Sequence, residues 1–286
     1  MTSDSWLDTH PYLRPFARFC GQVEGAAARL GDATAPLPSW DDYQSDFLKG
    51  VPLLQSSIAA VDLEPAGRLA VALVERLAST PLEGQLAAEV QRLDGDLRRE
   101  AAPALSISSW LIGDRTFAPS RPGLLRYLGW VATARYLRPA LEAFAKTREE
   151  HRWLRSYCPT CSSPPAMAQL IGIDPGRMRY LVCGSCSTRW RYSRTGCPFC
   201  ETDTRRIAVI AIEGQGGLRL DYCESCRAYL KTYEGQGRES VLLADWTSIH
   251  LDIAAQDRGL RRVAASMFEL NGCPAPPPGS AEQTQA

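Results

Sequence analysis

The sequence contains four Cys-x-x-Cys pairs between positions 158 and 226, namely Cys158-Pro159-Thr160-Cys161, Cys183-Gly184-Ser185-Cys186, Cys197-Pro198-Phe199-Cys200 and Cys223-Glu224-Ser225-Cys226. The third pair begins 39 residues after the first, and the fourth begins 40 residues after the second. The segments that separate the pairs within each half are 21 and 22 residues long. These near-equal spacings indicate a tandem duplication of one unit with two cysteine pairs.

Each unit predicts a four-thiolate metal site. Thiolates at i and i+3 in a tight turn bind one ion from one side, and a second pair brought in by a hairpin completes a tetrahedron. Interleaved pairing would make the equal spacings a coincidence, so we expect sequential pairing. The predicted ligands are Cys158, Cys161, Cys183 and Cys186 for site 1, and Cys197, Cys200, Cys223 and Cys226 for site 2. Four thiolates suit both zinc and iron, so the spacing leaves the metal open.

Two other uses of paired cysteines fit the sequence less well. A thioredoxin-type redox centre needs one Cys-x-x-Cys at a helix start in a βαβ unit, and the sequence predicts no such unit. Disulfides are also disfavoured, because we expect the chain to stay in the cytoplasm, as argued below, where thiols are kept reduced. Because cysteine fills every position of each site, no position is left for a substrate or an activated water, and we expect no hydrolytic metal chemistry.

Composition and charge are those of an ordinary globular protein. Of 286 residues, 45% are hydrophobic and 22% are charged, and the formal net charge is zero, so the whole molecule does not attract nucleic acid or anionic membranes. The first eight residues carry acids and no apolar run, unlike a secretory signal, and no run of about 18 apolar residues predicts membrane insertion. We therefore expect a cytoplasmic protein.

The expected fold is multidomain, with α and β parts. Residues 1–150 show apolar spacings of three and four, which predict an all-α bundle of five to seven helices, with Cys20 as a small buried hydrophobe. Pro139 lies inside the last predicted helix and should kink or break it. This part of the sequence contains no Gly-rich phosphate loop and no metal-binding histidine pair. We therefore expect no catalytic site there and predict that the protein is not an enzyme.

In each cysteine unit the pairs flank a predicted β-hairpin, formed by residues 166–172 with 178–182, and by 207–212 with 218–222. This is the layout of a zinc ribbon or rubredoxin, in which metal binding supplies much of the folding energy. Beyond Tyr229 the sequence predicts helix, first around 249–254 and then over 260–270. The predicted domains are a bundle (1–150), two metal ribbons (151–194 and 195–240), a C-terminal helical segment (241–270) and a disordered tail (271–286).

Residues 148–206 are locally basic, with ten arginines and five acids. Trp153, Tyr157, Trp190 and Tyr192 are interleaved with the arginines, a pattern that also occurs on surfaces that bind single-stranded nucleic acid. A nucleic-acid-binding zinc ribbon is therefore one alternative function, although the zero net charge argues against it.

The cysteine region resembles the FdhE-type formate dehydrogenase accessory proteins. The resemblance is specific over residues 150–260 and only general, as a helical domain of similar length, before them. It is carried by Cys158-Pro159-x-Cys161, Arg179-Tyr180-Leu181-x-Cys183-x-x-Cys186-x-x-x-Trp190, Cys197-x-x-Cys200, Cys223-x-x-Cys226-x-x-Tyr229-Leu230-Lys231 and Asp245-x-x-Ser248-x-x-Leu251-Asp252. One departure concerns the turns: many such turns have glycine after the second cysteine, where φ is positive, whereas this chain has Ser162, Ser187, Glu201 and Arg227.

The resemblance implies a cytoplasmic, non-catalytic chaperone for maturation of respiratory formate dehydrogenase. It would bind the catalytic subunit before twin-arginine export, and its two rubredoxin-like sites would hold iron, with zinc as the alternative. A redox protein acting on the client's metal or sulfur centre is a second candidate function, and a homodimer stays open. The residues we consider for contact with the partner are Arg189, Trp190, Arg191, Tyr229, Lys231, Asp245 and Asp252.

Overall fold

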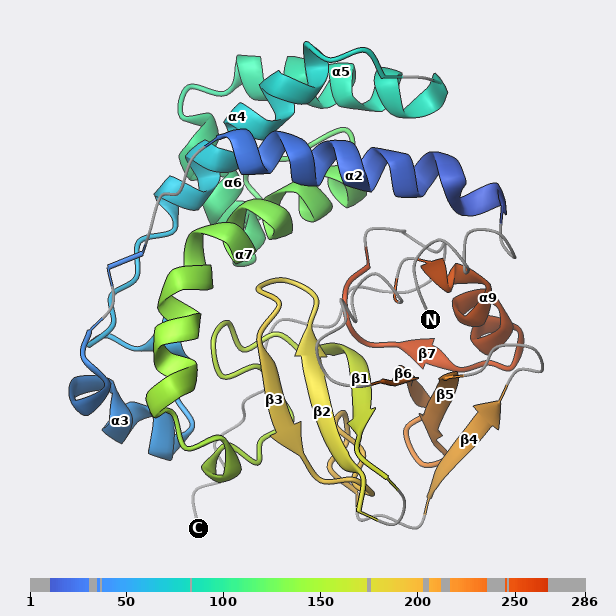
Figure 1. The fold of residues 1–286 in the computed structure, drawn as a ribbon. Coiled ribbons are helices and arrows are strands. Elements are labelled where there is room, and N and C mark those ends of the chain that lie inside the picture. The colour runs from blue at the N-terminus through green and yellow to red at the C-terminus, as the bar shows by residue number, and fades with distance from the viewer. Residues whose placement is uncertain are drawn as a thin grey trace.

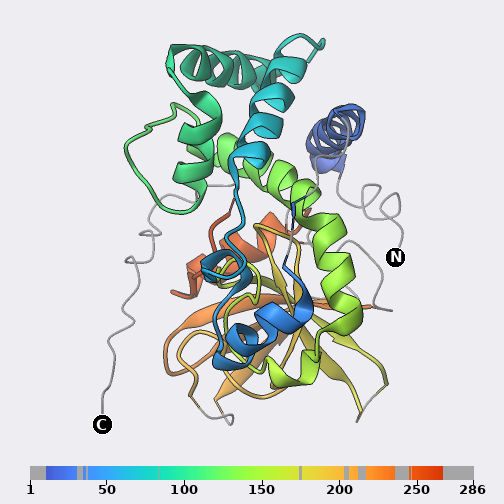
Figure 2. The same ribbon diagram turned by 90° about the vertical axis from the view of Figure 1, so that its left-hand side faces the viewer.

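The computed structural model describes residues 11–30, 35–36, 38–82, 84–173, 176–202, 206–211, 217–235, 245 and 247–266. A helical region lies on one side of the molecule and a mixed β-sheet on the other, and the helix α7 runs from the first to the second (Figures 1 and 2). Among the described helices, none combines the length and the apolar character needed to cross a bilayer. The predicted tail, 271–286, lies outside the described residues.

The helical region confirms the predicted N-terminal helices. Its helices are α2 (Arg14–Arg29), α3 (Trp40–Lys49), α4 (Glu64–Ala78), α5 (Gly84–Arg99), α6 (Pro103–Leu111) and α7 (Pro122–Thr147), with short 3-10 turns η1 (Pro11–Leu13), η2 (Leu53–Gln55) and η3 (Glu150–Arg152). Ser39 begins α3 by accepting a hydrogen bond from the Asp42 backbone N–H, as an N-cap does. Cys20 is buried in the core between α2, α4, α5, α6 and α7, as predicted.

Helix α7 belongs to two hydrophobic cores. Its first half places Leu125 and Leu128 in the core of the helical region. Its second half places Leu137 and Phe144 in another core that includes α3 and the first cysteine unit. The helix continues through Pro139, although proline lacks the N–H that would bind the preceding turn, and α7 is bent along its length (Figure 1). Pro139 therefore does not break the helix, and the bend of α7 brings its second half onto the cysteine region (Figure 1).

The sheet contains β1 (Pro165–Ile171), β2 (Met178–Cys183), β3 (Arg189–Tyr192), β4 (Ile207–Ala211), β5 (Leu218–Cys223), β6 (Ala228–Glu234) and β7 (Arg261–Arg262). The order is β3-β2-β1-β6-β5-β4, with β7 also beside β6. Both predicted hairpins are present, as β1–β2 and β4–β5. The two units also join in one sheet, because β1 and β6 pair in parallel with Met167 opposite Lys231. The sequence did not indicate this pairing.

Two predictions beyond the hairpins were wrong. Each unit has a third strand, and β6 continues as strand from Ala228 to Glu234, where the sequence predicted helix beyond Tyr229. The expected helix over 260–270 is also absent from its described part, where Arg261 and Arg262 pair with β6. The predicted C-terminal helix is present as α9 (Ile249–Asp257). The third strands form hairpins with β2 and β5 across the turns that contain cysteine pairs, and β6 also pairs with the distant strands β1 and β7. These pairings override the local pattern.

A buried network of charges holds α9 and β7 against β6. The Lys231 ammonium lies 2.8 Å from Asp245 and 2.7 Å from Asp252, and Arg262 binds the same carboxylates at 2.8 and 2.9 Å. The Tyr229 hydroxyl donates to Asp252 at 2.7 Å. Burial raises the pKa of Asp245, but the ion pairs with Arg262 and Lys231 outweigh it and lower that pKa to about 2. Two cations and two anions balance, so the network is buried without net charge.

We predict that Lys231→Met destabilises the fold by about 3–5 kcal/mol, because it leaves two buried carboxylates with one cation. Urea unfolding, with the midpoint and slope both recorded, measures the change. The control is Arg68→Met, which removes an exposed pair with Glu64 and should cost less than about 1 kcal/mol. Equal effects of the two substitutions would show that the network does not stabilise the fold.

Candidate metal centres

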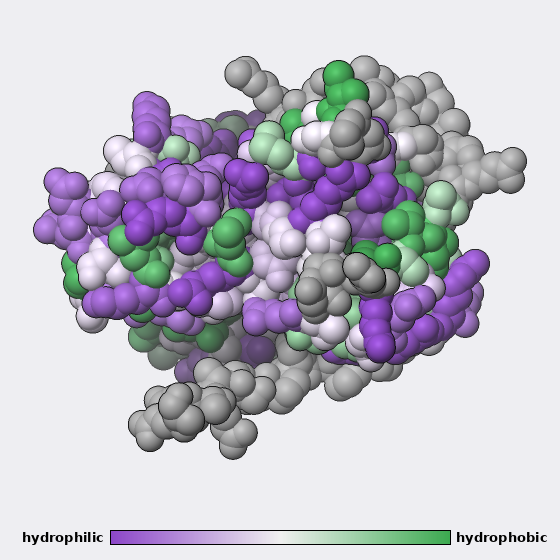
Figure 3. Space-filling view, turned by 90° about the horizontal axis from the view of Figure 1, so that it is seen from below, coloured by the Kyte–Doolittle hydropathy of each residue, from purple (hydrophilic) through white to green (hydrophobic). Residues whose placement is uncertain are grey.

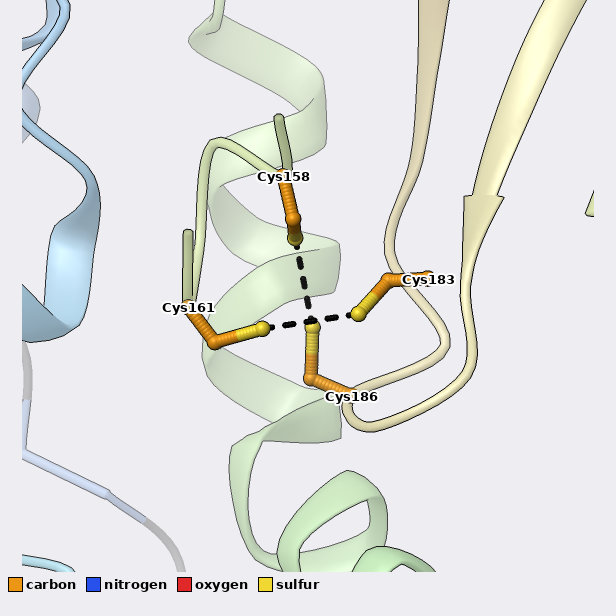
Figure 4. A group of neighbouring side chains, drawn as sticks. All are labelled: Cys158, Cys161, Cys183 and Cys186. Atoms are coloured by element: carbon orange, nitrogen blue, oxygen red, sulfur yellow. Dashed lines mark hydrogen bonds between the residues drawn. The ribbon is translucent and has the colours of Figure 1, made fainter. Parts of the chain in front are cut away.

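Site 1 lies where two turns of the first unit meet. The turns containing Cys158–Cys161 and Cys183–Cys186 face each other, and all four sulfur atoms lie within 4.8 Å of one another (Figure 4). The Sγ atoms of Cys158 and Cys186 are 3.5 Å apart, and those of Cys161 and Cys183 are 3.4 Å apart. The first and second cysteine pairs therefore form one group, as the equal spacings predicted.

Site 2 repeats this arrangement in the second unit. Its four sulfur atoms also lie within 4.8 Å of one another, and the Cys197–Cys226 and Cys200–Cys223 separations are both 3.7 Å. Four thiolates at about 2.3 Å from a tetrahedral zinc ion have sulfur–sulfur distances of about 3.8 Å. Both groups therefore fit one tetrahedral ion each, of a size that suits zinc or iron.

Each cysteine turn has a left-handed backbone conformation at the position where many such turns have glycine. The residue after the second cysteine has a positive φ in all four turns: 66° at Ser162, 59° at Ser187, 54° at Glu201 and 60° at Arg227. The amide of that residue donates to the carbonyl of the first cysteine in three of them, as Ser162 does to Cys158 at 3.0 Å. Side chains in this left-handed region cost roughly 1–2 kcal/mol each, so closing these turns stores local strain.

Donors around the sulfur atoms favour the thiolate form. Backbone N–H groups of Thr160, Ser185 and Phe199 each donate to the sulfur of the first cysteine in their turn at 3.4 Å. Hydroxyls add to them: Thr188 lies 3.1 Å from Cys186, and Thr202 lies 3.1 Å from Cys200. Hydrogen bonds to a charged group stabilise it and orient it for a metal ion.

Neighbouring sulfurs and burial shift the thiol pKa values in opposite directions. Burial raises the pKa of Cys158 well above its usual value, whereas hydrogen bonding with Cys158 lowers the pKa of Cys161. In site 2 burial raises the pKa of Cys200, but hydrogen bonds with Thr202 and its partner cysteines lower it overall, to about 6. Four thiolates this close repel one another strongly, and a bound cation removes that repulsion.

Most of the residues considered for partner contact lie in the interior. Tyr229, Lys231, Asp245 and Asp252 form the buried network described above, and Lys231 is 1% exposed. Trp190 is also buried, and its indole N–H donates to the Arg155 carbonyl at 3.0 Å. These five side chains contact other parts of the chain rather than solvent. Only Arg189 and Arg191, on β3, are exposed.

The aromatic side chains that suggested nucleic-acid binding are engaged within the fold. Trp153 is buried against Phe47, with ring centroids 4.9 Å apart, and its N–H donates to the Tyr157 carbonyl. The hydroxyls of Tyr157 and Tyr192 donate to the carbonyls of Gly50 and Cys197. A base-stacking surface needs exposed ring faces, whereas Trp153 and Trp190 are buried and Tyr157 and Tyr192 are only partly exposed.

The structural roles of two residues, Arg262 and Arg179, were not predicted from the sequence. Arg262 completes the buried network, and its only sequence signal was a place in an Arg-Arg pair. Arg179, on β2, is buried and donates to the Gly196 carbonyl at 2.9 Å, just before Cys197. It thereby links the first unit to the second, a long-range contact that no local pattern predicts.

We predict two metal ions per chain, one for each cysteine group, measured by elemental analysis of protein purified without chelators. The double variant Cys197→Ser/Cys223→Ser should retain one, and Cys20→Ser, which changes a buried cysteine outside both sites, should retain both. Acid should release the ions, because protons compete for the thiolates. A wild-type chain with one ion, or a double variant that still holds two, would contradict the assignment.

The strained turns give a second prediction. Ser187 is exposed and has a φ of 59°, so Ser187→Gly should raise the free energy of unfolding by about 1 kcal/mol, because glycine adopts this conformation without strain. Ser187→Val should lower it by a similar amount, because a β-branched side chain is disfavoured there. Denaturant unfolding of the metal-loaded proteins measures both. A lower stability for the glycine variant would mean that the turn is not strained.

Known proteins share sequence similarity with the region that contains these centres. Residues 157–194 match the family model of the FdhE central domain. The chain is 31% identical over 134 residues to an FdhE homolog of Aquifex aeolicus, covering 45% of this chain and 47% of the relative. It is 38% identical over 120 residues to an FdhE homolog of Pseudomonas aeruginosa, covering 38% of each. The chain thus spans less than half the length of these curated relatives.

A solved structure extends the likeness to nearly the whole fold. The crystal structure of the FdhE protein from Pseudomonas aeruginosa superposes with a TM-score of 0.64, at 23% identity, over 92% of this chain and 89% of the other. At that identity the likeness concerns the fold. The family model, the curated relatives and this structure together support an FdhE-type protein.

Proposed function

We propose that this chain is an accessory protein for the formation of formate dehydrogenase. The proposal rests on two similarities that occur together. The cysteine region is similar in sequence to FdhE proteins, and almost the whole chain shares the fold of one of them. In the finer form of the proposal, the protein works in the cytoplasm and binds the catalytic subunit before twin-arginine export. It does so without catalysing a reaction itself.

The geometry of the cysteine groups supports a non-catalytic role. Each group offers four thiolates to one ion, so the set of ligands is complete without a substrate or a water. Such sites stabilise folds, and here site 1 lies in the core shared by α3, α7 and the sheet. The proposal therefore treats the metal ions as parts of a rigid platform for binding a client protein.

The exposed surface favours a mixed polar and apolar contact with the client. The side chains shown in Figure 3 alternate between hydrophilic areas and small hydrophobic patches. The exposed arginines Arg189 and Arg191 lie on β3, at one end of the strand order, and Arg189 stacks on Tyr180 at 4.8 Å. Interfaces that form transiently have this mixed character, and arginine is enriched in them. We propose β3 as part of the surface that meets the client.

A redox role is the second candidate function, and one observation favours it. Cys200 of site 2 is exposed, so electrons could reach an iron ion there from outside the protein. Zinc has no redox chemistry, so this function requires iron. An absorption spectrum of anaerobically purified protein before and after air exposure separates the two metals, because ferric tetrathiolate absorbs visible light and zinc tetrathiolate does not.

Deleting the gene in its own host should abolish formate oxidation by respiratory formate dehydrogenase while leaving the enzyme's subunits synthesised. A plasmid copy should restore the activity, as should Cys20→Ser, whereas a double variant at Cys158 and Cys183 should not restore it, because site 1 lies in the shared core. The assay is dye-linked formate oxidation, with immunoblots for the subunits and for each variant. Full activity in the deletion strain would refute the proposed function.

The proposed client surface on β3 is tested with the double variant Arg189→Glu/Arg191→Glu. This variant should copurify less of the catalytic subunit and should keep both metal ions. The exposed Arg68→Glu, on α4 away from β3, is the matched charge control. Equal copurification by both variants would remove β3 from the proposed surface.

A further inference from the structure

The two cysteine groups have the same ligands but different access to solvent. In site 1, Cys158 and Cys183 are 0% exposed, Cys186 is 2% exposed, and only Cys161 is partly accessible. In site 2, Cys197 and Cys223 are buried, whereas Cys226 is half-buried and Cys200 is exposed. The duplication produced equal coordination sites in unequal surroundings.

The helical region covers both turns of site 1. The backbone N–H groups of Leu53 and Leu54, in η2, donate to the carbonyls of Pro159 and Thr160 at 2.9 and 2.8 Å. The other turn faces α7, since a Cβ atom placed on Gly184 would lie 3.8 Å from the Trp130 ring. Reaching the ion in site 1 therefore requires these contacts to open.

Contacts reach site 2 from several sides but leave part of it open: the Ser156 hydroxyl donates to the Glu201 carboxylate at 2.7 Å, and Phe199 packs against the core of site 1. Arg179 fixes the loop before Cys197 through the Gly196 carbonyl, and Arg261 of β7 donates to the Cys226 carbonyl at 3.1 Å. Next to the exposed Cys200, the turn residues Glu201 and Thr202 are exposed as well, and the other turn exposes Glu224 and Ser225. The end of α9 contacts the second of these turns, where the Arg227 side chain donates to the Arg258 carbonyl at 2.6 Å, and this contact leaves Cys200 exposed.

We propose that the two centres have different roles: site 1 is a permanent structural centre, and site 2 is an exchangeable metal centre that external soft ligands, such as thiols and chelators, reach beside Cys200. The physical reason is the cost of access. Exposing the ligands of site 1 means separating α7 and η2 from the sheet, which opens part of the buried core. Exposing those of site 2 requires movement of a turn in which Cys200 already faces solvent and whose hydrogen bond with Ser156 lies at the surface.

The proposal goes beyond the function in formate dehydrogenase formation and does not rest on it, because it concerns only the relative access to the two centres. It applies whether the ion is zinc or iron. It also separates the two candidate roles of a metal in this fold, since one centre serves stability and the other is available to a partner.

The test uses full-length protein loaded with two zinc ions per chain and mixed with excess 4-(2-pyridylazo)resorcinol, whose absorbance reports released zinc. We expect two phases of one equivalent each, with rates that differ at least about tenfold, which corresponds to a barrier difference of about 1.4 kcal/mol. In parallel, brief N-ethylmaleimide treatment followed by peptide mass spectrometry should label Cys200 and Cys226 before any ligand of site 1. A single phase for both ions, or earlier labelling of site 1, would overturn the proposal.

Two variants identify which site gives each phase of zinc release. Cys200→Ser should accelerate the fast phase and leave the slow rate unchanged. Trp130→Ala uncovers the turn at Gly184 and should accelerate only the slow phase. If Trp130→Ala unfolds the protein, the labelling order in the wild-type chain still decides the question. An unchanged fast phase in Cys200→Ser would refute the assignment of that phase to site 2.

Discussion

The convergence of four sulfur atoms within 4.8 Å in each unit is the constraint on which the rest of the structure depends. Such a group needs a cation, since four thiolates repel one another and burial opposes their charge. In return, the bound ion ties the two turns of a unit together and fixes the hairpin between them. Cys158, Cys183 and Cys186 also lie in the core that joins the sheet to α3 and α7, so the same ion supports the junction with the helical region.

The second constraint is the buried charge network on β6. Lys231 is opposite Met167 in the parallel pairing of β1 and β6, and its ammonium binds Asp245 and Asp252. The Tyr-Leu-Lys string after the fourth cysteine pair and the aspartates further along the chain therefore form one internal structure. This explains why they occur together in the sequence that suggested the family. It also gives them a structural role in the interior of the fold.

Local patterns predicted the parts of the structure that depend on local physics. Cysteine spacing identified both metal groups, turn residues identified both hairpins, and helical periodicity identified the N-terminal helices. The third strands β3 and β6 were missed because the turns that join them to β2 and β5 contain cysteine pairs, which were interpreted only as metal ligands. The parallel pairing of β1 with β6 was missed because its partners are distant, with Met167 opposite Lys231, 64 residues later in the sequence. Burial of Trp190 and Lys231 was also unforeseen, because a charged or aromatic residue in a strand has no local signal that says which surface covers it.

The central claim is that each unit holds one ion with four cysteine sulfurs and no other ligand. X-ray absorption at the metal edge of the purified protein tests this directly, since it counts and identifies the ligand atoms. We predict four sulfur neighbours at about 2.3 Å if the ion is zinc, averaged over the two centres. A spectrum that requires nitrogen or oxygen in the first shell, or fewer than four sulfur atoms per ion, would contradict the account.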